Sequence, residues 1–148
     1  MSGSNRGFWK VVVPLVVGGV VLVVLVLVFR PVARTGAVAY AQANLRRAAE
    51  AARDLATDGS LADADREMLA AAGVVDDLLL IDPDQSSNDP EVVSVLATRE
   101  AWTGSARAET GECFWIRVAA SGGTVVGTGT DCSADEASAA RPGTWPEP

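Results

Sequence analysis

The chain has 148 residues, enough for one domain and a membrane anchor, and it contains no histidine. Residues 1–34 carry four basic residues and no acid, whereas the remainder carries 8 basic and 19 acidic residues, a net charge of −11. So acidic a domain repels nucleic acid, which we therefore do not expect as a partner. The lack of histidine also removes the commonest general base and the commonest metal ligand.

The first predicted element is a transmembrane helix. Residues 11–29 are 19 consecutive residues without a charge. As a helix they would span about 28 Å, close to the roughly 30 Å of a bilayer core. Pro14 falls in the first turn, where its missing N–H is tolerated. We expect a short cytoplasmic basic segment at 1–10, a transmembrane helix at 11–30 and the lipid bilayer as a partner.

A cleaved secretory signal is the alternative for this segment. The apolar part of a signal peptide is about 7–15 residues long, shorter than the run found here. A small-residue cleavage site does exist at Ala37-Val38-Ala39. Arg30 and Arg34 separate it from the apolar run, which disfavours cleavage there. We therefore expect an uncleaved span.

The two cysteines, Cys113 and Cys132, bear on the orientation of the chain. As a disulfide they would stabilise the domain by roughly 3 kcal/mol, and disulfides persist outside the cytosol. A free buried pair is the alternative. The basic residues on the two flanks of the apolar run are nearly balanced and do not set the orientation of the chain, so we infer the orientation from the cysteines. They favour a single-pass protein of the cell membrane with its N-terminus in the cytoplasm and its C-terminal domain extracellular.

After Pro31 the pattern becomes that of an amphipathic helix. Its apolar positions recur at three- and four-residue steps: Val38, Ala41, Leu45, Ala48, Ala49, Ala52 and Leu55. The other face is charged: Arg46, Arg47, Glu50, Arg53 and Asp54. Asp58-Gly59 is expected to end this helix. A short second helix would follow, capped by Ser60 or Asp63 and closed by Gly73.

Strand patterns follow the two helices. The runs lie at 77–81, 92–98, 101–109, 112–119 and 124–128, with turns at Thr110-Gly111 and Gly122-Gly123. They predict an antiparallel meander of about four strands, one face of which is covered by the alanine stripe of the long helix. The fold class is therefore α+β, with the domain at 31–137. A polar, proline-rich tail at 138–148 follows, from which Trp145 is expected to dock on the sheet.

This plan resembles type IV pilins and pseudopilins. Residues 41–60 and 93–137 resemble pilin-like proteins of high-GC Gram-positive bacteria. In that group a tryptophan strand is followed by a Gly-x-Cys-Phe-x-Ile strand and a Gly-Thr-Gly-x-x-Cys return. The matching residues here are Trp102, Gly111, Cys113, Phe114, Ile116, Gly127, Thr128, Gly129 and Cys132. The resemblance covers residues 35–145.

The N-terminus departs from the pilin pattern. Pilin leaders are cut between a glycine and a phenylalanine, and Gly7-Phe8 match that pair. Pilins also carry a glutamate at the fifth mature residue, where this chain has Val12. Lys10 adds a charge that subunits packed at that depth would bring together. The resemblance thus implies leader cleavage at Gly7-Phe8, while the missing glutamate opposes ordinary filament packing.

No arrangement of catalytic residues is evident. The serines have no histidine partner, and the glycines of 122–129 lack the lysine and following helix of a phosphate loop. The acidic run 81–91 offers calcium-type oxygens from Asp82, Asp84 and Asp89, together with Ser86 and Asn88. It lacks the loop glycine and closing glutamate of an EF-hand, so a solvated acidic loop is preferred. No cofactor is indicated.

These features predict a non-enzymatic structural protein: a minor pilin, a pseudopilin or a related protein of a type IV pilus or secretion system. Its partners would be other pilin-like subunits or pilus assembly proteins. The alternative is a membrane-anchored extracellular binding or sensor domain on a pilin-like scaffold that never assembles.

Overall fold

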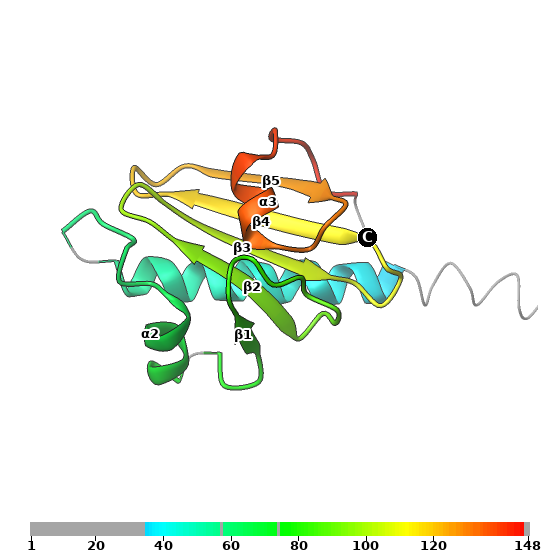
Figure 1. Ribbon diagram of the computed structural model, residues 1–148, viewed down its shortest axis with the longest axis horizontal. Coiled ribbons are helices and arrows are strands. Elements are labelled where there is room, and N and C mark those ends of the chain that lie inside the picture. Colours follow the sequence, from blue (N-terminus) through cyan, green and yellow to red (C-terminus); the bar gives the residue numbers. More distant parts are fainter. Residues whose placement is uncertain (1–34, 57, 74, 147–148) are drawn as a thin grey trace, which may run out of the picture. The chain divides into compact units, whose positions relative to one another are not determined.

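A long helix and a five-stranded sheet form most of the computed structural model, which describes residues 35–56, 58–73 and 75–146 (Figure 1). The long helix extends over 35–54. The elements after it are α2 (Arg66–Ala71), β1 (Leu79–Ile81), β2 (Val92–Ala97), β3 (Ala101–Arg107), β4 (Cys113–Ala119), β5 (Thr124–Gly129) and α3 (Ala134–Ala139). They belong to one compact unit, Gly36–Pro148.

The transmembrane helix predicted at 11–30 lies outside the described residues. Among the residues that are described, no helix is both long enough and apolar enough to span a bilayer.

The strands lie in the order β1-β2-β3-β4-β5. The meander from β2 to β5 is antiparallel throughout, as predicted. The prediction of about four strands in a purely antiparallel sheet is wrong, because β1 adds a fifth strand that is parallel to β2. Leu80 of β1 lies opposite Val93 of β2 and is buried with it, so the short strand extends the core by one position.

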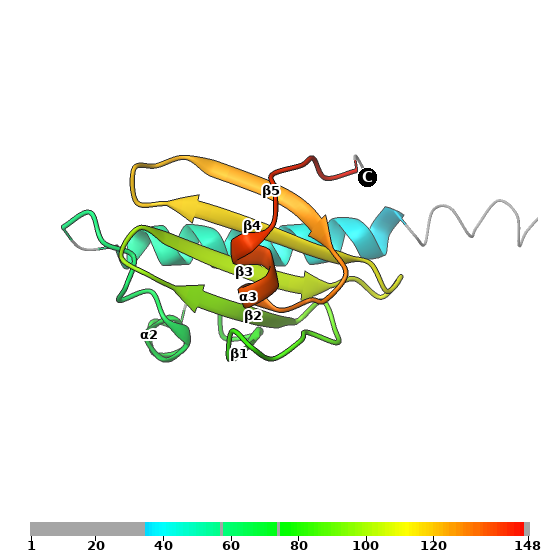
Figure 2. The same cartoon turned by 45° about the horizontal axis from the view of Figure 1, so that its top comes forward.

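The two faces of the sheet carry different helices (Figures 1 and 2). The long helix lies along one face, where the even-numbered residues Phe114, Ile116 and Val118 of β4 belong to the buried core. The alternate residue Arg117 points to the other face and donates to the carbonyl oxygen of Ala140 in α3's C-cap, at 3.1 Å. The sheet is therefore covered on both faces, whereas the sequence pattern predicts a helix on only one.

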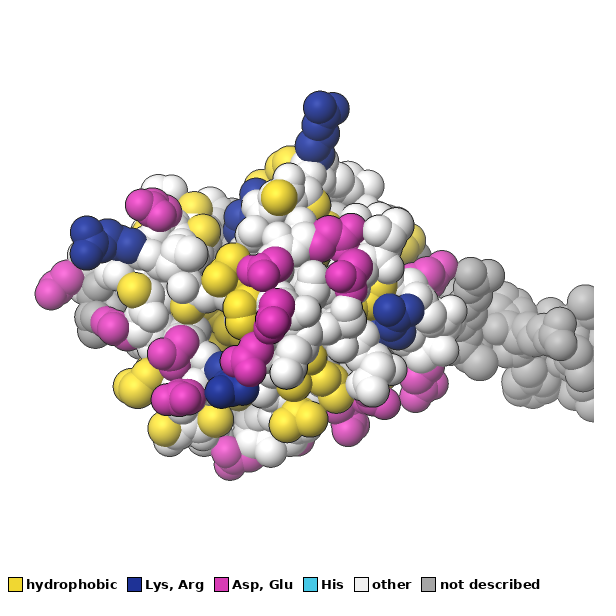
Figure 3. Space-filling view, viewed as in Figure 1, with side chains coloured by type: hydrophobic (Ala, Val, Ile, Leu, Met, Phe, Trp, Pro, Cys, Tyr) yellow, Lys and Arg dark blue, Asp and Glu magenta, His cyan; other side chains and the backbone are white. Residues whose placement is uncertain are grey.

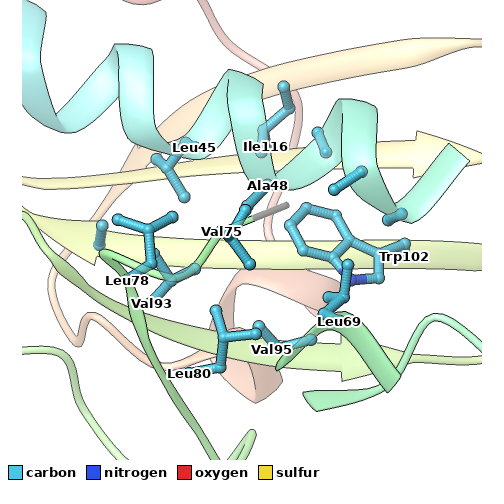
Figure 4. Close-up of a cluster of buried hydrophobic side chains, with 14 of the residues drawn as sticks. Leu45, Ala48, Leu69, Val75, Leu78, Leu80, Val93, Val95, Trp102 and Ile116 are labelled. Atoms are coloured by element: carbon cyan, nitrogen blue, oxygen red, sulfur yellow. The ribbon is translucent and has the colours of Figure 1, made fainter. Parts of the chain in front are cut away.

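Small side chains let the long helix approach the sheet closely (Figure 4). Its predicted apolar stripe is confirmed, since Leu45 and Ala48 are fully buried among strand residues such as Val93 and Trp102. Alanine also has the highest helix propensity, so the same residues favour the helix and its packing. The helix ends before Asp58 and Gly59, whose backbones adopt φ values of 50° and 73°.

Polar side chains fasten one flank of the long helix to the segment before β2. The hydroxyl of Tyr40 donates to Glu91 at 2.7 Å, and the amide of Asn44 donates to the carbonyl oxygen of Pro90 at 2.9 Å. Further along the same flank, Arg47 pairs with Asp77 at 2.8 Å. These residues recur at helical spacing, so the row fixes the rotation of the helix on the sheet.

The short helix α2 begins later than predicted. Its N-cap is Asp65, which accepts from the backbone N–H of Met68 at 2.9 Å, so neither Ser60 nor Asp63 is the cap. Gly73, with φ of 66°, follows the helix as expected for a C-terminal glycine. Leu69 is fully buried in the core, whereas Met68 is about half exposed.

The helix α3 is an addition to the predicted elements, because its sequence ADEASA lacks an apolar stripe. Ser133 caps it by accepting from the N–H of Glu136 at 3.3 Å. The carboxylate of Glu136 turns back and accepts from the N–H of Asp131 at 2.6 Å and the hydroxyl of Thr130 at 2.9 Å. Figure 3 shows acidic side chains spread over this face of the domain, in line with the charge predicted from the sequence.

The close packing of β3 can be tested at Gly104. A Cβ added there would lie 2.5 Å from the ring of Trp102, which is fully buried. We expect Gly104→Ala to lower the free energy of unfolding by about 1–3 kcal/mol, because an overpacked core must shift. Gly123→Ala is the matched control, since a Cβ at Gly123 meets no atom within 4 Å. Equal denaturation midpoints for the two variants, measured by circular dichroism in urea, would contradict the packing described.

Candidate functional site

A hollow lies between the long helix and β5, and we call it the helix–β5 cleft. It has a volume of about 460 Å³. One wall comes from the long helix, a second from β4 and β5, and the C-terminal segment closes one end. The lining residues are Arg46, Ala49, Glu50, Arg53, Ile116, Thr124, Val126, Thr144 and Trp145.

Trp145 forms the closed end of the cleft. Its indole N–H donates to the carbonyl oxygens of Gly127 at 3.0 Å and Trp115 at 3.2 Å. Its ring meets Phe114 edge-on, with centroids 6.3 Å apart and an interplanar angle of 85°. The preceding Gly143 donates its N–H to Val126 at 2.8 Å and forms an antiparallel bridge with it. The predicted docking of Trp145 on the sheet is thus confirmed.

Three charged residues of the long helix line the cleft. The guanidinium of Arg46 lies 4.9 Å from the centroid of the Trp145 ring. At the opposite end, Arg53 donates to the hydroxyl of Thr124. Glu50 lies between them on the helix and has no ion-pair partner within the described part of the chain. The cleft is therefore an amphipathic site with a positive balance in a strongly acidic domain.

A disulfide stabilises a second region of the domain, where β4 meets the segment after β5. Cys113 of β4 is bonded to Cys132, which follows β5, with a Cα–Cα distance of 5.2 Å. The carbonyl of Cys132 accepts from the N–H of Ser87 at 2.9 Å, and Ser86 donates to Asp131. The disulfide therefore joins β4 to the segment after β5, and the hydrogen bonds of Ser86 and Ser87 attach the acidic loop at 81–91 to that segment. The predicted disulfide is confirmed.

The three calcium candidates in that loop have separate surroundings. Asp82 pairs with Arg66 at 3.0 Å, and Asp89 accepts from the N–H of Glu91 at 2.9 Å. Asp84 is exposed. Within residues 35–56, 58–73 and 75–146, no three carboxylates or thiolates gather in a way that could hold a metal ion. The structure does not bring the sequence-predicted ligands together.

Two pKa values outside the cleft are shifted. The hydrogen bond from Arg47 holds the pKa of Asp77 below its ordinary value of 3.8. The hydrogen bond to Glu91 raises the pKa of Tyr40, because a phenolate beside that carboxylate would lose the bond and face a like charge. Both groups lie at the surface, where their bonds attach the long helix to neighbouring segments. Neither residue lines the cleft.

The Asp77 shift predicts a small acid-sensitive contribution to stability. Because the folded pKa is lowered, the contribution is present above the unfolded value of 3.8 and is lost as the pH falls through the folded pKa. We expect Asp77→Asn to flatten the acid limb of the melting-temperature profile slightly and to leave its shape above pH 5 unchanged. Asp84→Asn, an exposed matched control, should preserve the wild-type acid limb. An unchanged acid limb in Asp77→Asn would refute the linkage.

The sequence pattern predicts the residues of the cleft only in part. It assigns Arg46, Glu50 and Arg53 to the charged face of the helix, away from the sheet. One feature of β5 could have indicated the cleft. Val126 lies on the helix side of the sheet, and the apolar stripe of a single helix is too narrow to cover five strands. Gly7 and Phe8, the predicted leader site, lie outside the described residues.

No protein-family model matches this chain, and neither a curated protein nor a solved structure shows significant similarity to it.

Proposed function

We propose that this chain is a non-enzymatic, single-pass, membrane-anchored subunit of the type IV pilin or pseudopilin kind. One observation carries the proposal. A helix with an alanine-rich face packs on an antiparallel meander whose last two strands are held by the Cys113–Cys132 bond. That arrangement joins the two segments, 41–60 and 93–137, whose sequences resemble pilin-like proteins of high-GC Gram-positive bacteria.

The same disulfide supports an extracellular location for the domain, because disulfides persist outside the cytosol. The uncharged run at 11–29 supports anchoring in the cell membrane. The protein would act as a minor pilin or pseudopilin of a type IV pilus or related secretion system. Its partners would be other pilin-like subunits or pilus assembly proteins.

Val12 and Lys10 set this chain apart from a major pilin. A major subunit needs a carboxylate near its new amino terminus, because an unpaired charge in the bilayer is costly. A minor subunit is present in few copies, at a filament tip or during initiation. The Lys10 side chains of neighbouring copies then need not pack beside one another. The proposal is therefore a minor subunit rather than the repeating one.

Shearing filaments from the native cells tests the proposal. A minor subunit should co-sediment with the sheared filaments, and loss of the prepilin peptidase should return it to the membrane fraction. A membrane protein without a leader site serves as the control for membrane contamination. Retention of the chain in the membrane fraction, with and without the peptidase, would refute assembly.

The runner-up is a membrane-anchored binding or sensor domain that never enters a filament. The helix–β5 cleft favours it, since structural packing alone does not require an open, charged hollow of about 460 Å³. This alternative predicts that the chain stays in the membrane fraction in the shearing experiment.

A further inference from the structure

The helix–β5 cleft carries charges that alternate along one helix. Arg46 and Glu50 are four residues apart, and Glu50 and Arg53 are three apart, so their backbones rise by about 6 Å and 4.5 Å along the helix axis. Such i,i+4 and i,i+3 pairs often bond to one another. Here no ion pair joins them. Arg46 instead contacts Trp145 at the closed end of the cleft, and Arg53 donates to Thr124 of β5.

Arg46 is held in a way that leaves its hydrogen-bonding edge available. The cation–π contact with Trp145 uses the flat face of the guanidinium. Its N–H groups point outward in the plane of the group, in the fork that suits a carboxylate. Within the described part of the chain those N–H groups have no hydrogen-bond partner. Trp145 is itself fixed by two hydrogen bonds, so the guanidinium has a rigid support.

The other two charges differ from Arg46. Arg53 already donates to Thr124 and closes the far end of the cleft. Glu50 lies one helical turn from Arg46 and offers a carboxylate to a cation. The cleft thus presents one anion-binding residue and one cation-binding residue whose backbones are about 6 Å apart along the helix axis, comparable with the length of about 7 Å of an extended dipeptide.

Two apolar residues lie on the wall opposite the helix, beside the hydroxyl of Thr124. Ile116 and Val126 face each other across β4 and β5 on the helix side of the sheet. The volume of about 460 Å³ lies in the lower part of the range for small-ligand sites, roughly 300–1,000 Å³. A bound molecule would therefore be small, with an apolar group and two opposite charges.

We propose that the helix–β5 cleft binds a short zwitterionic peptide of about dipeptide size. Its carboxylate would bind Arg46, its ammonium would bind Glu50, and its apolar side chain would lie against Ile116 and Val126. This site goes beyond the structural role proposed above. The binding site does not depend on whether the chain enters a filament. The shearing experiment can therefore contradict the proposed function without contradicting the binding site, and the binding experiment can do the reverse.

Isothermal titration of the full chain in mild detergent tests the site, with L-alanyl-L-leucine as the probe. We expect binding in the millimolar range or tighter. N-acetyl-alanyl-leucine, which lacks the ammonium, and alanyl-leucinamide, which lacks the carboxylate, should each bind about tenfold more weakly, the usual effect of losing one charge-assisted hydrogen bond. Addition of the dipeptide should also shift the indole N–H resonance of Trp145, identified with Trp145→Phe.

Variants of the two charged residues complete the test. Arg46→Gln and Glu50→Gln should each weaken binding of the dipeptide about tenfold while the melting temperature stays near wild type, because both residues are exposed. Arg99→Gln, an exposed arginine outside the cleft, should bind as wild type does. Equal heats for the zwitterionic and blocked peptides, or no heat at about 10 mM dipeptide, would overturn the proposal and leave the charges as a solvated helix face.

Discussion

Replacing Leu45 by alanine is expected to lower the free energy of unfolding by about 2–5 kcal/mol, the range found when a large buried aliphatic side chain is truncated. Leu45 is fully buried where the long helix crosses the sheet, and it lies within van der Waals reach of the Gly104 position. Its neighbours on the helix are alanines, which cannot fill the space that its side chain would leave. Urea denaturation followed by circular dichroism measures the loss.

Leu79→Ala is the matched control for Leu45→Ala. The same three side-chain carbons are removed, but Leu79 is 62% exposed at the start of β1. Its removal should change the unfolding free energy by less than about 1 kcal/mol. If both substitutions cost the same, the helix does not pack on the sheet as described.

Removing the disulfide is the second large effect. The Cys113→Ala/Cys132→Ala variant should lose about 3 kcal/mol of stability, because the bond closes a loop with a sequence separation of 19 and restricts the unfolded chain. It also joins β4 to the segment that carries α3, so hydrogen exchange in 130–140 should accelerate more than in β2 and β3. Denaturation in urea and exchange mass spectrometry measure the two effects.

Reductant supplies the control for the disulfide. Dithiothreitol should destabilise the wild-type protein by a similar amount and leave the double alanine variant unchanged. If reductant shifts the midpoint of both proteins equally, the destabilisation arises elsewhere in the chain.

Local periodicity is enough to predict most of the fold. The helix stripe around Leu45 and the alternation in 112–119 repeat at the periods of a helix and a strand, so both elements and the buried face of each can be predicted. The turns at Thr110-Gly111 and Gly122-Gly123 then require β3, β4 and β5 to pair as a meander. These features depend on neighbours in sequence.

The elements that periodicity does not reveal depend on distant contacts or on capping. β1 pairs in parallel with β2 through a connection at 82–91 that is shorter than the dozen or more residues usual for a parallel crossover. The helix α3 has no apolar stripe and is held by its N-cap, Ser133, and by the side chain of Glu136. The Ser-x-x-Glu spacing at 133–136 is the signal that indicates its start.

The cleft follows from the width of the sheet. One helix is about 10–12 Å across, whereas five strands spaced by about 4.8 Å span roughly 19 Å. A single helix therefore leaves a strip beside β5, where Trp145 covers one part and the cleft remains as the other. The sequence predicts that Arg46 and Glu50 face solvent and that Trp145 docks on the sheet. Their meeting in one cleft depends on contacts between distant segments and could not be predicted.

The intact mass of the protein purified from its native membrane tests the proposed function most directly. The pilin-like function predicts a mature chain that begins at Phe8, because Gly7-Phe8 matches the leader cut. Gly7→Val should abolish this product, while Gly3→Val, a change at another glycine of the same segment, should leave it intact. Chains that retain residues 2–7 in the wild-type protein would contradict the pilin pathway.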